Sequence, residues 1–323
     1  MNEILPLIFT LLMGIAILLY VVLDGYDLGV GMLMPAASRE EQQVMVNSIG
    51  PFWDANETWL VLGIGLLLVA FPAAHGVVLG ALYLPVAAML VGLMVRGVAF
   101  EFRVKAQGWH RELWNWLFYA GSFLASFAQG LMLGRYVTGF EPGFGAWLFA
   151  LVVAGAVCGG YVLLGSTWLV LRAEGGLQQK AIVWARWGLG WVALGVALIS
   201  IATPVASETV RDKWFSFPNL IFVSPLPILT LLAGIFVWRS LGHSDWKPFA
   251  GTVAIFALSF AGLAYSLFPY VVLDRLTIWE AAAHPSSLKF MLVGAIIVLP
   301  AIAGYTIYVY RVFGGKAKGG ELY

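Results

Sequence analysis

The sequence predicts an all-α membrane protein with about nine transmembrane helices. Of its 323 residues, 61% are hydrophobic and 11% are charged, against about 45–50% and about 25% in soluble domains. Apolar runs recur along the whole chain, and most approach the roughly 20 residues that a helix needs to cross the hydrocarbon core. Because the links between the runs are short, we expect residues 1–323 to form a single polytopic membrane domain.

Nine apolar segments are expected to span the membrane. They are residues 4–24 (with an extension to 34), 55–74, 78–100, 114–137, 146–171, 182–203, 219–240, 249–271 and 288–312. Proline disfavours helical geometry in the residue before it, so helix ends are expected at Phe71 and Thr203. The N-terminus lacks the basic flank of a cleavable signal peptide, and its apolar stretch is therefore interpreted as a retained helix.

The distribution of lysine and arginine predicts the orientation. With nine spans, five basic residues fall on the side of the N-terminus: Arg135, Arg211, Lys213, Arg275 and Lys289. Twelve fall on the side of the C-terminus: Arg39, Arg103, Lys105, Arg111, Arg172, Lys180, Arg186, Arg239, Lys247, Arg311, Lys316 and Lys318. Because basic residues are enriched in cytoplasmic loops, the C-terminus is predicted to be cytoplasmic and the N-terminus external or periplasmic.

Acidic residues gather at the expected cytoplasmic side of the first three spans. Asp24 and Asp27 lie near the end of the first span, Asp54 and Glu57 lie in the first turn of the second, and each pair is spaced i, i+3 on one helix face. The third span adds Arg96, Glu101 and Arg103. Ionisable groups at bilayer depth are costly and often line a proton or substrate path, so this cluster is the candidate functional site.

Each of these features also has a purely structural interpretation. Acids in a first turn favour the helix dipole, Arg96 is suited to neutralise a buried acid, and Arg103 is expected to extend to the lipid headgroups. Gly25 and Gly29 form a small-xxx-small pair that favours close helix packing.

Tryptophans and histidines allow fewer conclusions. Trp53 and Trp59 are candidates for a quinone contact, although an interfacial aromatic belt is the default interpretation. A haem at bilayer depth needs an axial ligand inside the bundle. The four histidines, His75, His110, His243 and His284, all lie near predicted loops. The nine methionines are interpreted as packing residues, so we expect neither haem nor another metal on this chain.

Five ordered blocks carry a family resemblance. They are LDGYDLGVGML (23–33), MVNSIGPFWDANETWLV (45–61), RGVAFEFRVK (96–105), LWNWLFYAGSF (113–123) and LFPYVVLDRLTIWEAA (267–282). Together they resemble subunit II of the cytochrome bd-type quinol oxidases, including the cyanide-insensitive branch. The resemblance covers essentially the whole chain, although residues 140–260 match only in hydropathy.

The resemblance implies a fold and a set of partners. The fold is two four-helix bundles, approximately residues 1–138 and 139–272, with a ninth helix at 288–312. The expected partner is a subunit I that carries the b and d haems and oxidises quinol. The resemblance also allows small single-helix accessory subunits and a structural quinone in a bacterial inner membrane. Quinol and membrane lipid are the other expected partners, and no nucleic acid is expected.

The resemblance also implies a role for the acids. This chain would be a non-haem subunit that contributes to proton uptake from the cytoplasm while O2 is reduced to water. Asp54 matches the aspartate of the family's WD pair and Asp27 the second aspartate of its DGYD block. Asp54 is then the expected uptake acid, Asp27 and Glu57 are relay residues, and Asp24, Arg96 and Glu101 tune the protonation of Asp54.

Two alternatives remain at this point. A secondary transporter also carries intramembrane charges, near helices broken at the midplane, but here the charges lie near one side and no matching pair of broken helices is evident. A purely structural scaffold would use the same acids for folding alone.

Overall fold

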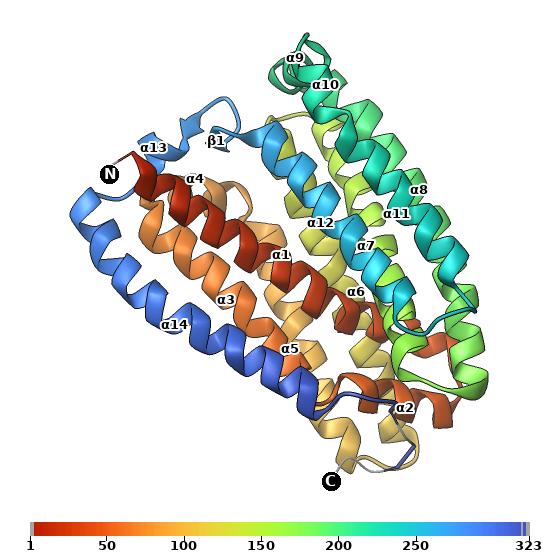
Figure 1. Cartoon of the computed structure of the whole chain (residues 1–323). Coiled ribbons are helices and arrows are strands. Elements are labelled where there is room, and N and C mark those ends of the chain that lie inside the picture. Colours follow the sequence, from red (N-terminus) through yellow and green to blue (C-terminus); the bar gives the residue numbers. More distant parts are fainter. Residues whose placement is uncertain (1–2, 318, 321–323) are drawn as a thin grey trace.

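The computed structural model describes residues 3–317 and 319–320 and is almost entirely helical (Figure 1). Its elements are α1 (Ile4–Leu33), the 3-10 helix η1 (Met34–Ala36), α2 (Arg39–Ile49), α3 (Trp53–Ala70), α4 (Pro72–Ala81), α5 (Tyr83–Lys105), α6 (Trp109–Val137), α7 (Phe144–Arg172), α8 (Gly175–Ala206), α9 (Glu208–Phe215), α10 (Asn219–Val223), α11 (Pro225–Ser240), α12 (Lys247–Leu267), β1 (Tyr270–Val272), β2 (Leu276–Thr277), α13 (Ile278–Ala281) and α14 (Pro285–Val312).

Within the described residues, nine helical segments are long and apolar enough to cross a membrane, which confirms the predicted number. The third span was placed too early, because the chain breaks at Leu82 and residues 78–81 belong to the short helix α4. The helix end at Phe71 is confirmed, whereas α8 continues through Pro204 to Ala206. The eighth span stops at Leu267, since the next residues enter the antiparallel hairpin β1–β2.

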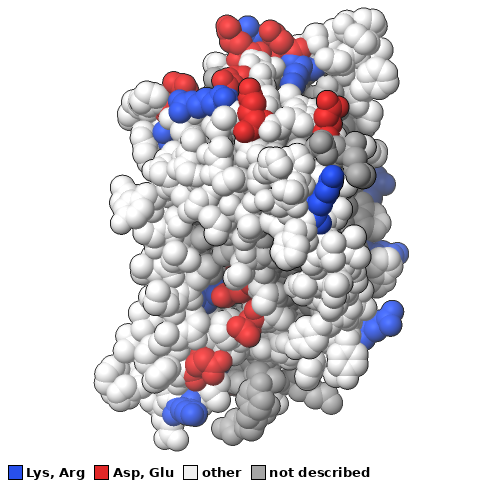
Figure 2. Space-filling view, turned by 90° about the vertical axis from the view of Figure 1, so that its left-hand side faces the viewer, with Lys and Arg blue, Asp and Glu red and all other residues white. Residues whose placement is uncertain are grey.

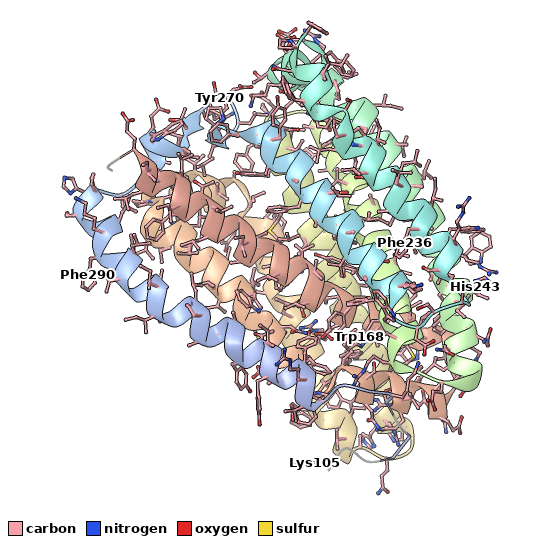
Figure 3. The ribbon with its side chains drawn as sticks, in the orientation of Figure 1. Lys105, Trp168, Phe236, His243, Tyr270 and Phe290 are labelled. Atoms are coloured by element: carbon pink, nitrogen blue, oxygen red, sulfur yellow. The ribbon has the colours of Figure 1, made fainter. Side chains whose placement is uncertain are left out.

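The two ends of the helical body differ. We call the end that carries α2 and Lys105 the α2 end, and the end that carries α9, α13 and Tyr270 the α9 end (Figures 1 and 3). α2 begins with a capping box in which Ser38 and Glu41 bond each other's backbone N–H groups, a pattern that fixes a helix start. The face drawn in Figure 2 is mainly uncharged in its middle, as expected for a surface in contact with lipid or with another membrane subunit.

Close packing of α1 against α7 sets the centre of the fold. A methyl group added to Gly29 would lie 1.8 Å from the carbonyl oxygen of Tyr161, and one added to Gly165 would lie 2.4 Å from the backbone of Gly29. Only glycines allow two helix backbones to approach this closely. The helix-packing interpretation of Gly29 is therefore confirmed.

The largest apolar core extends across the predicted boundary between the two bundles. It contains Met89 of α5 and Phe118 of α6 together with Leu163 of α7, Ile182 of α8 and Ile255 of α12. α1 also packs against both α6 and α7. The division at residue 138 stays a prediction, because helices from both sides of it contribute to this one core.

Candidate functional site

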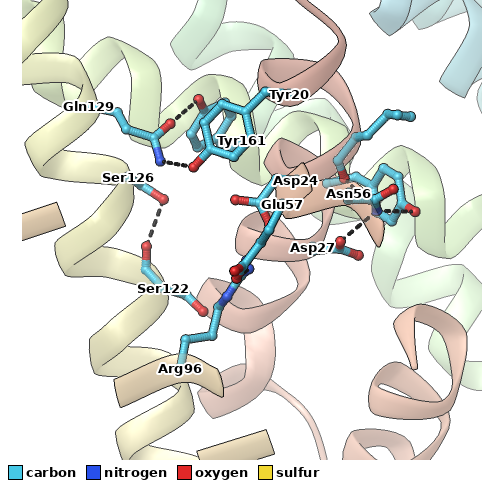
Figure 4. Close-up of polar contacts among 12 residues, drawn as sticks. Tyr20, Asp24, Asp27, Asn56, Glu57, Arg96, Ser122, Ser126, Gln129 and Tyr161 are labelled. Carbon is cyan, nitrogen blue, oxygen red and sulfur yellow. Dashed lines mark hydrogen bonds and ion pairs between the residues drawn. The ribbon is translucent and has the colours of Figure 1, made fainter. Parts of the chain in front are cut away.

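An ion pair between three helices forms the centre of the candidate site (Figure 4). Arg96 of α5 donates from Nη1 to Oδ1 of Asp24 on α1 at 2.6 Å, and from Nη2 to Oε1 of Glu57 on α3. We call these three residues the acid–arginine cluster. The sequence predicted that these charges would lie together, and the structure shows which of them are in contact.

The members of this cluster differ in their exposure. Asp24 and Arg96 are buried, whereas the side chain of Glu57 is 28% exposed. Oδ2 of Asp24 and Nε of Arg96 are buried without a hydrogen-bond partner in the described part of the chain. Buried ionised groups are stable only when they are paired, so Arg96 is what allows a carboxylate at the position of Asp24. Glu57 lies one turn inside α3, rather than in its first turn as predicted.

A second hydrogen-bonded group surrounds Asp27. Asn56 of α3 donates to Oδ2 of Asp27 at 2.8 Å and to the hydroxyl of Tyr26 at 2.9 Å. The hydroxyls of Tyr26 and Tyr310 lie 2.5 Å apart, and Tyr310 of α14 donates to Oδ1 of Asn56 at 3.1 Å. Asp27 is thus buried and hydrogen-bonded, but it belongs to a different group from Asp24.

A third group extends the polar interior toward the middle of the bundle. Gln129 of α6 donates to the hydroxyl of Tyr20 on α1 at 2.8 Å and accepts a bond of 2.6 Å from Tyr161 on α7. Tyr20 lies one turn before Asp24 on α1 and therefore on the same face. No sequence pattern used above indicated these residues or Asn56. For Gln129 the available signal was a lone amide within an apolar run, whereas Asn56 lies among the polar residues Asp54, Glu57 and Thr58 and carries no such signal.

The remaining candidate residues lie outside these groups. Asp54 and Glu101 are exposed and have no ion-pair partner among residues 3–317 and 319–320. Trp53 is half-buried, with its ring 5.1 Å from that of Phe100. Trp59 is buried beside Ala16 and Tyr20, so it does not belong to an exposed aromatic belt.

The prediction for Arg103 was wrong. Its side chain is 2% exposed and does not extend to the headgroups. Nε of Arg103 donates to Oδ1 of Asn115 at 2.5 Å and Nη1 to Oε1 of Gln43 at 3.0 Å. The polar helix α2 supplies Gln43, and this partner is the reason that the guanidinium stays inside.

Known proteins resemble this chain in sequence over most of its length. The family model described as "Cytochrome bd terminal oxidase subunit II" matches residues 5–313. The chain is 31% identical to "Cytochrome bd ubiquinol oxidase subunit 2" of Bacillus subtilis (strain 168), with 90% of each protein covered. It is 28% identical to "Cytochrome bd-I ubiquinol oxidase subunit 2" of Escherichia coli (strain K12), covering 98% of this chain and 96% of that protein.

A solved structure supports the fold. The chain matches "The structure of bd oxidase from Geobacillus thermodenitrificans" with a TM-score of 0.81 at 17% identity, covering 96% of this chain and 98% of the other. The resemblance seen in the five sequence blocks is confirmed, and the transporter alternative is no longer needed. This chain is a multi-pass bacterial membrane protein that belongs to the cytochrome bd terminal oxidase subunit II family.

Proposed function

We propose that this chain, as subunit II of a quinol-oxidising terminal oxidase, takes up protons at its α2 end and passes them inward through the acid–arginine cluster. The observation that carries the proposal is the placement of Arg96 between one fully buried and one partly exposed carboxylate. Such an arrangement connects the surface with the interior by ionisable groups on three neighbouring helices.

The proposed route begins at Asp54. Asp54 is exposed and lies one helical turn before Glu57 on α3, so it would collect protons at the entrance. Glu57, across Arg96 from Asp24, would be the second carrier and Asp24 the innermost one. This order differs from the expected one, in which Asp24 only tuned Asp54. Asp27 would be a hydrogen-bonded side branch, and Glu101 an exposed acid that raises the local proton concentration.

The orientation is part of the proposal. The basic residues of the α2 end include Arg39, Lys105 and Arg111, and this end would face the cytoplasm by the positive-inside rule. The N-terminus, at the α9 end (Figure 1), would then be external. Protons would therefore enter from the cytoplasm, in agreement with the expectation from the sequence.

The residues of this chain do not fit a haem. None of its four histidines is buried, and the space between α1, α6 and α7 holds the side chains of Tyr20, Gln129 and Tyr161. We therefore assign the haems of the complex to the subunit I partner and derive no step through them. Among the two tryptophan candidates, Trp53 is the one exposed enough to contact a structural quinone.

Substitution of the acids in the assembled complex tests the route. Asp24→Asn and Asp54→Asn are expected to lower quinol-driven oxygen consumption by about 10²-fold, the typical contribution of a positioned proton-transfer group. Haem content from the visible spectrum reports assembly. Glu174→Gln, which changes an exposed acid at the start of α8, is the matched control and is expected to keep full activity.

The outcomes separate the alternatives. Normal turnover with full haem content in Asp54→Asn would remove Asp54 from the route but leave Asp24 in it. Normal turnover in both variants would make the acids purely structural. Single-turnover proton uptake in vesicles, measured with a pH dye on each side, tests the proposed direction.

A further inference from the structure

A second polar site lies at the α2 end, apart from the acid–arginine cluster. A surface cavity of about 550 Å³ is bounded by the start of α2, by the link between α5 and α6, and by Gly319 and Gly320 of the C-terminal tail. Its charged lining residues are the basic Arg39 and Arg111 and the acidic Glu40 and Glu112, and its polar lining includes Gln43 and Asn115. The route proposed above uses none of these residues.

Two guanidinium groups converge on one neutral acceptor in this lining. Arg103 and Arg111 both donate to Oε1 of Gln43, and within the described residues neither arginine has a carboxylate at ion-pair distance. The nearby acid Glu112 is already paired with Arg39 at 2.5 Å. Among residues 3–317 and 319–320, these two adjacent positive charges share an uncharged oxygen and have no counter-anion.

Arg103 contributes a buried guanidinium next to this cavity. It does not line the cavity itself but is buried directly behind the lining, since its hydrogen-bond partners Gln43 and Asn115 are both lining residues. Its Nη2 group is buried with no hydrogen-bond partner in the part of the chain that the structure describes. A buried N–H of a guanidinium without an acceptor is costly, and an anion oxygen is the acceptor that arginine binds best.

The N-terminus of α6 also favours a negatively charged ligand in this cavity. Gly108 lines the cavity and precedes the helix with φ of 56°, and no side chain caps the first turn. Free N–H groups at a helix N-terminus favour negative charge, phosphate in particular. The arginines and the helix start therefore point to the same kind of ligand.

We propose that this cavity binds a phosphate group through Arg111 and the start of α6, with the buried Arg103 behind Gln43 as the second positive charge. The phosphate of an anionic lipid headgroup and free inorganic phosphate share the required chemistry. Phe102, Trp109 and Trp116 on the adjoining ends of α5 and α6 are 58%, 68% and 57% exposed. Aromatic residues of this kind mark the headgroup level of a bilayer, where a lipid phosphate is available.

The first experiment measures retained lipid. The complex is purified in mild detergent, exchanged into phosphatidylcholine, and analysed by native mass spectrometry for bound phosphatidylglycerol. The wild type is expected to keep the anionic lipid, and Arg111→Gln to lose it by about tenfold, as the loss of one charge-assisted hydrogen bond predicts. Arg239→Gln, an exposed arginine of α11, is the control. Arg103→Gln removes a buried side chain and so also affects folding. The decisive variant is therefore Arg111→Gln, at a half-buried position.

The second experiment distinguishes the sources. Delipidated complex is heated in inorganic phosphate or in chloride of equal ionic strength, using the wild type, Arg111→Gln and Glu321→Gln. Free phosphate is supported if phosphate raises the thermal unfolding midpoint of the wild type, Arg111→Gln abolishes this rise, and no lipid is retained in the first experiment. The lipid headgroup is supported if phosphatidylglycerol is retained and phosphate does not raise the midpoint. Failure of both overturns the proposal. A rise confined to Glu321→Gln also overturns it, because a carboxylate of this chain would then be the occupant.

Discussion

The helices α1, α5, α6 and α7 form an inner group that differs sharply from the outer helices α8, α11 and α14. In the most apolar stretches of the inner helices, between 28% (α1) and 56% (α7) of residues are buried, against 11% in α8 and in the α10–α11 segment and none in α14. Every buried charged residue in the described chain belongs to the inner group: Asp24, Asp27, Arg96, Arg103, Arg135 and Arg172. Both groups are strongly apolar, so hydrophobicity alone does not separate them.

The difference follows from what stabilises helices in lipid. Apolar side chains gain little by leaving lipid for protein, so association depends on close backbone approach and on polar contacts. The inner helices have both, through Gly29 and Gly165 and through the acid–arginine cluster. The outer helices present their apolar faces to lipid or to a partner subunit, as Phe290 does on α14 (Figure 3). Changes in the inner group should therefore have the larger effects.

The largest effect is expected for Arg96→Met. Removal of the guanidinium leaves the buried carboxylate of Asp24 unpaired, and breaking a buried ion pair on one side costs about 3–5 kcal/mol. We expect little assembled complex, measured as haem-containing complex recovered from membranes. Arg239→Met on the outer helix α11 is the matched control and is expected to assemble normally.

A double substitution makes this prediction specific. Asp24→Asn combined with Arg96→Met removes both buried charges and is expected to recover assembly, although not proton transfer. Equal recovery of Arg96→Met and Arg239→Met would show that the buried pair does not hold the inner helices together.

An intermediate effect is expected for Gly29→Ala. The added methyl group would meet the carbonyl oxygen of Tyr161 at 1.8 Å, and overpacking of this kind typically costs about 1–3 kcal/mol. Gly190→Ala in α8 is the control, since nothing lies within 4 Å of the added methyl group. Thermal unfolding of the purified complex should show a lower midpoint for Gly29→Ala and an unchanged or higher one for Gly190→Ala.

These cases also show what the sequence alone could predict. Nine spans and the gathering of acids at one side follow from local patterns, because hydropathy and i, i+3 spacing are properties of a short segment. The burial of Arg103 depends on Gln43 and Asn115, which come from two other helices. The exposure of Asp54 likewise depends on which neighbours pack around α3. Partners distant in sequence decide such details, and no local pattern encodes them.

The smallest effect is expected for Tyr310→Phe, and it tests the boundary between the two groups. α14 is the most exposed of the nine spans in its apolar stretch, yet Tyr310 bonds to Tyr26 and Asn56 of the inner group. Loss of this hydroxyl removes contacts worth about 1 kcal/mol, so the thermal midpoint should fall slightly while Phe290→Ala, on the same helix, leaves it unchanged. Asn56 also bonds Asp27. A clear fall in oxygen consumption at a temperature where the Tyr310→Phe complex stays folded would therefore show that α14 supports the polar interior. Identical behaviour of the two variants would instead make α14 an outer helix throughout.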